Sequence, residues 1–342
     1  MTAFRVEPMD LRSVADIPTG SQWLYEPKWD GFRCIAHRDG EQITLLSKNG
    51  QPLERYFPEV AAALGRTGAD VFTVDGELVV PVAGALSFDA LQGRIHPAAS
   101  RVALLARTTP ARYILFDMLR SAGESLVERP LRERRAELER FARAGAGIAE
   151  LRLSPATTDR RIVDDWFAHV GGALDGVVAK RLDLAYAAGT RDGGVKIKKQ
   201  RTADCVVGGM RFAAHAPERV GSLLLGLYDS QGRLDYIGFC SAFAAAERRE
   251  LGERLAPYRG GAGFTGNAPG AEPSRWSRDP ERDRSYIALR PEVVLEVGFD
   301  QVTAGRIRHG TKPLRWRTDK SARSCTTDQL TISGPALDLL DL

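Results

Sequence analysis

Apolar and polar positions alternate over short stretches of the first 200 residues, which is typical of β-strands. Residues 42–50 end at an Asn-Gly pair, a strong turn signal, while residues 112–119 are nearly all apolar and predict a buried strand. Strands are expected over 22–36 (two strands around Asp30-Gly31), 42–50, 71–80, 112–119, 174–183 and 193–201.

Two helices interrupt these strands. Residues 130–145 begin with a proline, place Leu131, Leu138 and Phe141 on one side and end with a glycine. Residues 162–172 give a second helix with a glycine stop. Strands with interspersed helices predict an α/β or α+β domain over residues 1–200.

The pattern changes after about residue 201, where short apolar segments are separated by Gly and Asp turns. One helix is expected over 244–258, and the Gly/Pro-rich residues 259–274 are expected to form a flexible surface loop. Short strands are expected over 203–212, 221–229, 234–243 and 293–303. About five short strands with one helix suggest a small β-barrel of the OB type, so the 342 residues divide into domains 1–200 and 201–342.

The overall composition is uninformative, but the positions of the charged residues along the chain are not. Hydrophobic residues (43%) and charged residues (27%) are normal for a soluble protein, and the net charge of +4 discriminates poorly. Residues 190–201, however, hold five basic groups and one acid, and residues 301–323 hold seven and one. Such clusters suggest phosphate-bearing partners, although a solvated basic face explains either cluster equally well.

The cysteines and the N-terminus bear on the compartment. Cys34, Cys205, Cys240 and Cys325 are widely spaced, so neither a zinc site nor a disulfide framework is expected. The N-terminus has no apolar signal region, and no apolar run approaches the roughly 18 residues of a membrane span. The sequence therefore predicts a cytoplasmic protein.

Lys28 stands among aromatic residues in "YEPKWDGFRC", residues 25–34. This segment is either a strand running into a hairpin or the setting of a reactive amine. An ordinary lysine has a pKa of about 10.4, so a nucleophilic lysine needs desolvation or neighbouring cations. Lys196 and Lys198, two apart in a strand and therefore on one face, supply such cations if they meet Lys28 around a polyphosphate.

Three acid–glycine pairs also interrupt apolar segments: Asp30-Gly31, Asp75-Gly76 and Asp175-Gly176. Each pair by itself is typical of a turn. Glu77 lies inside an apolar run, where a buried acid needs a partner such as a sugar hydroxyl or a divalent cation. Asp175 is a second oxygen ligand suited to Mg²⁺ near phosphates.

These residues resemble the ordered motifs of the covalent nucleotidyltransferases, which include ATP-dependent DNA ligases, RNA ligases and mRNA capping enzymes. "KWDGFR" resembles the family's motif KxDGxR, and the later motifs follow in family order as far as Lys320. They are "SKNG" (47–50), "VDGEL" (74–78), "LFDML" (115–119), "DGVVAK" (175–180), "VKIKK" (195–199) and "RWRTDK" (315–320).

The resemblance implies an α+β fold: a nucleotidyltransferase (ATP-grasp-like) adenylation domain of antiparallel sheets and helices, followed by an OB-fold barrel. It also implies roles. Lys28 would attack the α-phosphate of ATP and carry the AMP. Other nucleotide-binding residues would be Glu26, Arg33, Glu77, Phe116, Lys180, Lys196, Lys198, Arg317 and Lys320, with Asp319 beside the last two. Glu77 and Asp175 would hold Mg²⁺ or Mn²⁺, and Lys48 and Arg55 would contact DNA.

Two positions depart from the family pattern. Asp175 stands where glutamate is usual, which weakens the expected metal role, and Lys48 stands where arginine is usual, which loses a bidentate fork. Trp29 is expected in the core rather than against ATP.

The whole chain is most similar to compact bacterial ATP-dependent DNA ligases of the ligase C type. The resemblance therefore implies an enzyme that seals nicked duplex DNA in repair, through a lysyl-AMP and a DNA-adenylate. A monomer is the default expectation. The alternatives are an RNA ligase of the same superfamily and a non-catalytic OB-fold protein that binds nucleic acid.

Overall fold

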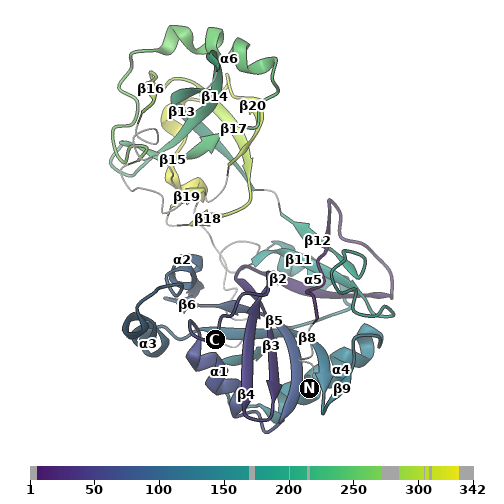
Figure 1. Cartoon of the computed structure of the whole chain (residues 1–342). Coiled ribbons are helices and arrows are strands. Elements are labelled where there is room, and N and C mark those ends of the chain that lie inside the picture. The colour runs from purple at the N-terminus through teal and green to yellow at the C-terminus, as the bar shows by residue number, and fades with distance from the viewer. Residues whose placement is uncertain are drawn as a thin grey trace. The chain divides into compact units, whose positions relative to one another are not determined.

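Two β-sheets form the frame of the first part of the chain (Figure 1). The computed structural model describes residues 6–168, 174–199, 201–213, 216–270, 285–303, 305–307 and 310–330. The chain divides into two compact units after Lys199.

The first unit contains twelve strands and five helices among its described residues. Its strands are β1 (Arg12–Val14), β2 (Trp23–Trp29), β3 (Phe32–Asp39), β4 (Gln42–Ser47), β5 (Val71–Val79), β6 (Pro81–Val82), β7 (Ala85–Leu86), β8 (Arg112–Ser121), β9 (Glu124–Ser125), β10 (Leu151–Leu153), β11 (Leu174–Arg181) and β12 (Gly194–Lys198). Its helices are α1 (Pro58–Gly65), α2 (Phe88–Gln92), α3 (Ala99–Thr108), α4 (Leu131–Ala144) and α5 (Arg160–Ala168).

The first sheet has the order β1-β12-β11-β2 and the second has the order β10-β8-β5-β3-β4. Strand pairs are antiparallel except for β1 with β12 and β10 with β8. Helix α5 covers one face of the first sheet, where Val163 and Trp166 pack on Tyr25, Val177 and Ile197. Because side chains alternate along a strand, Glu26 and Lys28 point to the opposite face of β2.

One face of the second sheet packs on α1 and α4. Phe141 of α4 meets Phe72 of β5 edge to face, with ring centroids 4.8 Å apart. Leu138 and Leu64 are fully buried in the same core. This packing leaves Arg33, Asp75 and Glu77 on the sheet's free face.

The chain crosses from one sheet to the other at Asp30-Gly31. β2 pairs with β11, whereas β3 pairs with β4 and β5, so the hairpin interpretation of residues 25–34 is wrong. The crossing requires glycine because a Cβ at Gly31 would lie 2.1 Å from the carbonyl oxygen of Leu78.

The turn interpretation also fails for the other two acid–glycine pairs, which lie inside β5 and β11. In β11, Leu174 faces Trp29 and Gly176 faces Lys28, which leaves Asp175 as the extra residue of a β-bulge. Gly176 has φ +151°, and a Cβ there would lie 2.0 Å from the carbonyl oxygen of Ile197. A bulge re-aims the side chain of its extra residue, here that of Asp175.

A second bulge lies across from Asp75-Gly76. Asp117 of β8 faces Asp75, and Leu115 faces Gly76, so Phe116 is the extra residue between them. Glycine at position 76 lets β8 approach, since a Cβ would lie 2.5 Å from the carbonyl oxygen of Ile114. The bulge gives Phe116 an orientation that simple alternation along β8 does not give.

The second unit contains a six-stranded sheet. Five of its strands follow the order β15-β14-β13-β17-β20, and β16 pairs with β13. Its strands are β13 (Arg201–Ala213), β14 (Ala216–Tyr228), β15 (Leu234–Cys240), β16 (Ile287–Ala288), β17 (Val294–Phe299), β18 (Val302–Thr303), β19 (Arg306–Ile307) and β20 (Lys312–Trp316). Its helices are α6 (Glu247–Leu255) and the 3₁₀ turns Ala256–Tyr258, Ala322–Ser324 and Thr327–Leu330.

A bridge between Cys240 and Thr311 joins the two ends of this path and closes the barrel. The amide of Thr311 donates to the carbonyl oxygen of Phe239 at 3.1 Å. Leu251 and Leu255 of α6 pack into the barrel's core. The predicted combination of an α+β unit of mainly antiparallel sheets and a following β-barrel is confirmed.

The element predictions hold with some differences. The helix predicted over 130–145 is α4, and the one predicted over 162–172 begins earlier as α5, while its glycine end lies outside the described residues. The loop predicted over 259–274 is tied down in its described part, because Phe264 is buried in the barrel's core.

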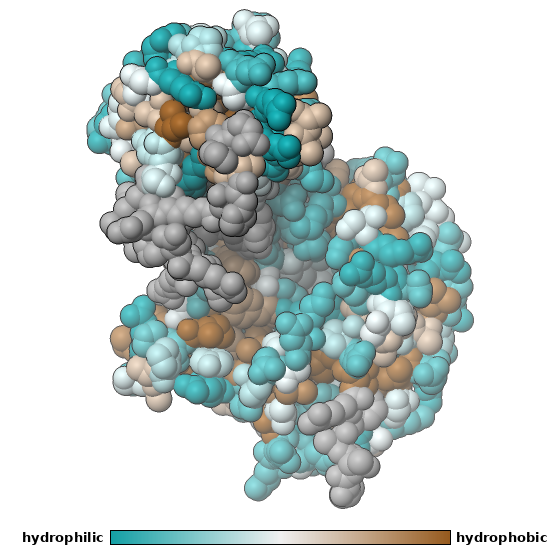
Figure 2. Space-filling view, turned by 45° about the horizontal axis from the view of Figure 1, so that its top comes forward, coloured by the Kyte–Doolittle hydropathy of each residue, from teal (hydrophilic) through white to brown (hydrophobic). Residues whose placement is uncertain are grey.

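Helices α1, α2 and α3 were not predicted. Among the described residues, the helices are too short or too polar to cross a bilayer. On the face shown in Figure 2, hydrophilic side chains are spread over both units.

Candidate active site

A cleft of about 220 Å³ lies in the first unit and takes side chains from both sheets. The first sheet contributes β2, β11 and β12, and the second contributes β3, β5 and β8. The predicted site residues that line the cleft are Glu26, Lys28, Arg33, Lys48, Glu77, Phe116, Lys180 and Lys196. Residues spread over 170 positions of sequence therefore meet at one place.

Lys28 projects from β2, and its side chain is 21% exposed. Its ammonium nitrogen lies 2.5 Å from an oxygen of Asp175, and the same oxygen lies 3.2 Å from Lys198. The bulge in β11 makes this contact possible. A nucleophilic lysine reacts as the free amine, so the predicted role of Lys28 would require this ion pair to open.

Glu26 and Lys180 form a buried ion pair beside Lys28. The Lys180 ammonium donates to both oxygens of Glu26 at 3.1 Å and to the carbonyl oxygen of Phe116 at 3.3 Å. It also lies 4.5 Å from the centroid of the Phe116 ring. Lys180 therefore holds Glu26 and Phe116 in place, and its predicted contact with phosphate stays a prediction.

Arg33 is fixed by a second network. Its guanidinium donates to both oxygens of Asp75 at 2.5 Å, and its Cζ lies 4.7 Å from the Phe116 ring centroid. The hydroxyl of Tyr186 donates to Asp75 at 2.6 Å and accepts from the amide of Met9 at 2.8 Å. This network orders the wall of the cleft that Phe116 occupies.

Glu77 lies on the same face of the second sheet as Arg33 and accepts a hydrogen bond from the Gly31 amide at 3.1 Å. Burial raises the pKa of its carboxyl to about 7. The charges of Arg33 and Lys28 oppose this shift, while those of Asp30 and Asp75 add to it. Glu77 therefore titrates near neutral pH.

Replacing Glu77 with glutamine is expected to change the pH dependence of stability. Since the folded-state pKa is about 7 and the ordinary value is 4.5, the folded chain binds more protons between these values. The contribution of Glu77 to the free energy of unfolding therefore falls as pH rises from about 4.5 through about 7, by at most about 3 kcal/mol. Glu77→Gln removes this loss.

Urea denaturation of both proteins in EDTA, at acid and at mildly alkaline pH, measures the effect. The variant should gain stability relative to the wild type as the pH rises. The same difference between the two proteins at both pH values would contradict the raised pKa.

The carboxylates of Glu77 and Asp175 suit a divalent cation. The described residues contain no group of three or more side chains able to hold a metal. Mg²⁺, however, is commonly held by one or two carboxylates, with water and substrate phosphate completing its shell. Glu77 lines the cleft, and Asp175 is nearly buried against Lys28, which also lines it, so each carboxylate lies at or next to the cleft.

The remaining predicted residues of the first unit divide between the cleft and elsewhere. Lys48 lines the cleft and pairs with Asp10 at 3.1 Å. Arg55 lies outside the cleft lining, where it donates to the carbonyl oxygen of Pro97 and lies over the Tyr56 ring. Trp29 is buried as expected and donates to Ser154 at 3.0 Å, but it also borders the cleft.

Arg317 and Lys320 of the second unit meet at Asp204. Arg317 donates to both Asp204 oxygens at 2.9 and 3.1 Å, and Lys320 donates to one of them at 2.6 Å. Arg317 also forms two hydrogen bonds of 2.9 Å with Asp319. Two carboxylates therefore orient the cations of "RWRTDK".

Sequence reasoning missed Asp10, Tyr186 and Asp204. Asp204 stands in an apolar strand, as Glu77 does, and the same argument about a buried acid would have found it. Asp10 and Tyr186 carry no local signal, because their partners are distant in sequence.

Comparison with known proteins shows the family of the chain. The model of the ATP dependent DNA ligase domain matches residues 6–198, and that of the ATP dependent DNA ligase C terminal region matches residues 216–320. DNA ligase C2 of Mycolicibacterium smegmatis is 45% identical over 95% of this chain and 94% of that protein. DNA ligase C of Mycobacterium tuberculosis is 42% identical over 95% of this chain and 93% of its own length.

Solved structures agree. A structure of mycobacterial DNA ligase D complexed with ATP and MES has a TM-score of 0.51 and 27% identity, over 94% of this chain and 98% of that one. A Lig E DNA ligase structure, with a TM-score of 0.56, 16% identity and coverage of 92% of this chain and 100% of that one, supports the fold alone. Since family models match both units and relatives of 42–45% identity cover nearly the whole length, the chain belongs to the ATP-dependent DNA ligase family.

Proposed function

We propose that this protein seals nicks in duplex DNA with ATP and that Lys28 carries the AMP. The observation that carries the proposal is the cleft itself, where one lysine that can attack phosphorus stands among cations, an aromatic ring and two carboxylates. In-line phosphoryl transfer needs little more from a protein than positioning and charge stabilisation.

The reaction has three steps. The Lys28 amine attacks the α-phosphorus of ATP, an N–P bond forms, and pyrophosphate leaves. The AMP then passes to the 5′-phosphate at a nick, which frees Lys28. The 3′-hydroxyl finally attacks the activated 5′-phosphate, forms the phosphodiester and releases AMP, a far better leaving group than hydroxide.

We assign the side chains as follows. Phe116 offers its ring to adenine, and Arg33 and Glu77 bind the ribose side of the nucleotide. Lys196 and Lys198 contact phosphate oxygens, while Lys180 acts by holding Glu26 and Phe116. Arg317 and Lys320, from domain 201–342, orient the pyrophosphate.

A divalent cation, Mg²⁺ or Mn²⁺, would neutralise phosphate charge when bound, and Glu77 and Asp175 would hold it. Lys48 and Arg55 contact the DNA backbone as positive charges. We further propose a monomer that acts in DNA repair in the cytoplasm, where ATP and DNA are both present.

A panel of nicked duplexes tests the proposal. We expect ATP-dependent sealing of a nick with 5′-phosphate and 3′-hydroxyl ends in all-DNA duplexes, and no sealing of a 5′-hydroxyl nick. EDTA should abolish both sealing and the labelled protein–AMP band on a denaturing gel, and added Mg²⁺ or Mn²⁺ should restore them.

Two outcomes favour the alternatives. Sealing confined to nicks with RNA strands would make the protein an RNA ligase. Binding of nucleic acid without any protein–AMP band would make it a non-catalytic OB-fold protein.

A further inference from the structure

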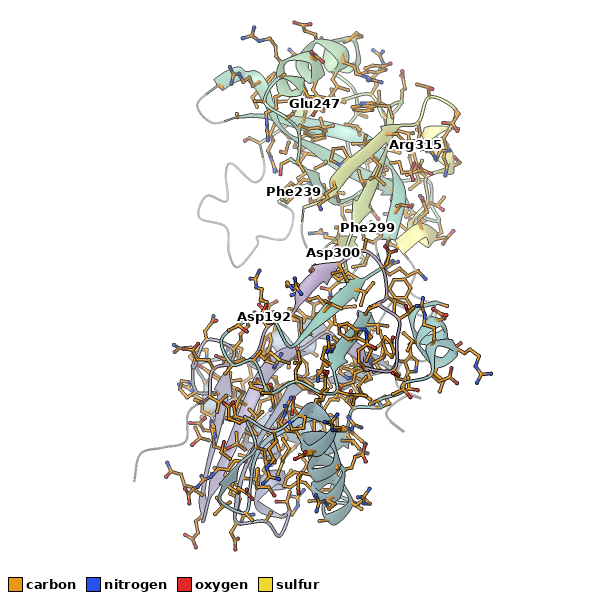
Figure 3. All side chains as sticks on the ribbon, turned by 90° about the vertical axis from the view of Figure 1, so that its right-hand side faces the viewer. Asp192, Phe239, Glu247, Phe299, Asp300 and Arg315 are labelled. Carbon is orange, nitrogen blue, oxygen red and sulfur yellow. The ribbon has the colours of Figure 1, made fainter. Side chains whose placement is uncertain are left out.

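Asp10 places a carboxylate in the nucleotide cleft, and the assigned roles do not use it. Its oxygens lie 3.1 Å from Lys48, 3.5 Å from Lys196 and 3.7 Å from Arg191. Arg191 precedes Asp192, which Figure 3 labels in the loop before β12. Two of the three cations line the cleft, so the carboxylate lies among groups suited to phosphate.

The position of this carboxylate is built into the fold. The Leu11 amide donates to Oδ1 of Asp10 at 2.9 Å, and the Asp10 amide donates to the carbonyl oxygen of Thr190 at 2.9 Å. The neighbouring Met9 is 3% exposed, and it bonds to the Tyr186 hydroxyl and to Arg33. The backbone is thus held on both sides of Asp10, and the Leu11 amide also binds the carboxylate itself.

Asp10 is ionised at any pH at which the enzyme works. Burial alone would raise the pKa of its carboxyl, but the Leu11 hydrogen bond and the charges of Lys48 and Lys196 hold it at about 2. A polyphosphate bound to Lys196 therefore meets a fixed negative charge beside that lysine.

We propose that Asp10 is a positioning residue that limits how tightly the cleft holds phosphate groups, so that pyrophosphate leaves after Lys28 has reacted. This inference rests on the proposed function, because it takes the cleft as the ATP site. The carboxylate keeps Lys48 and Lys196 at the cleft and at the same time offsets part of their charge. Its removal strengthens phosphate binding rather than weakening it.

Coulomb's law gives the size of the effect. A unit charge at roughly 5 Å from a phosphate charge changes binding by about fourfold in water-like surroundings and by more where solvent is excluded. Since the cleft is open to solvent, we expect a change of about four- to tenfold.

The test uses the full-length, unadenylated protein with pyrophosphate and with ATP. Asp10→Asn should lower the inhibition constant of pyrophosphate in the protein–AMP assay and the KM for ATP, each about four- to tenfold. The gain should shrink in high salt, because salt screens exposed charges. Calorimetric titration with pyrophosphate alone measures the same change without chemistry.

Three further variants complete the experiment. Asp10→Glu keeps the charge and should bind pyrophosphate as the wild type does. Asp10→Ser keeps a hydrogen-bond acceptor for Leu11 and should match Asp10→Asn, which protects the test if one variant folds poorly. Asp183→Asn removes an exposed carboxylate that pairs with Arg181 and should change neither constant.

Unchanged or weaker pyrophosphate binding in both neutral variants would overturn the inference, since Asp10 would then only support the lysines. Failure of the wild type to form a protein–AMP band would instead overturn the proposed function. The two failures are therefore distinguishable.

Discussion

Lys28→Ala is expected to abolish the protein–AMP adduct and the sealing of ordinary nicks, with a loss on the order of 10³-fold or more. In the proposed mechanism the Lys28 nitrogen forms the bond to phosphorus, and no other described lysine both contacts Asp175 and lines the cleft. Incubation with α-labelled ATP and a divalent cation, followed by a denaturing gel, measures the adduct directly.

A nick that already carries the 5′-adenylate separates this loss from a general defect. Its sealing needs no nucleophilic lysine and should survive in Lys28→Ala. Lys199→Ala is the matched control: Lys199 follows β12 and donates to the carbonyl oxygen of Ala168, so adduct formation should continue. A labelled band that persists in Lys28→Ala would refute the covalent mechanism.

Arg134→Met is expected to lower the free energy of unfolding by about 3–5 kcal/mol, the largest single effect on stability that we anticipate. Arg134 and Asp117 are each 1% exposed, and their bidentate contact spans 2.8 and 3.1 Å. Arg134 also donates to the carbonyl oxygens of Arg129 and Leu184. Methionine would leave Asp117 as an unpaired buried charge.

Chemical denaturation measures this loss of stability, and two further variants show its cause. Arg140→Met removes an exposed arginine that pairs with Glu137 on the same helix, and should change stability by less than about 0.5 kcal/mol. Arg134→Met combined with Asp117→Leu should recover much of the loss, because no charge is then buried alone. A double variant as unstable as Arg134→Met would point to lost packing instead.

Strands were the most predictable part of the fold. Alternation, continuous apolar runs and turn residues located β2 to β5, β8, β11 and β12; β8 for example is buried on both faces over seven successive residues. Helix α3 escaped prediction because only Val102 of its ten residues is buried, so it has no apolar stripe to detect. Helix α1 did carry a signal, Pro58 and Glu59 at its start, that the prediction did not use.

The site was predictable as a set of residues but not as a geometry. Motif order identified Lys28, Glu77, Phe116 and Asp175, yet two of these owe their orientation to β-bulges: Phe116, which lines the cleft, and Asp175, which contacts Lys28. A bulge depends on how two distant strands register, which no local pattern encodes. Glycine inside a strand was the one available sign, and its assignment to a turn at Gly76 and Gly176 was wrong.

The Asp30-Gly31 link has a mechanical consequence. Because β2 ends at Trp29 and β3 begins at Phe32, two residues tether the walls of the cleft directly beside Lys28. Three steps of the chain separate Trp29 from Phe32 and span at most about 11 Å, so the walls can separate least at this hinge and most at the edges furthest from it. The two walls can therefore move apart at their far edges to admit a nucleotide, while the spacing between Lys28 and Arg33 stays nearly constant.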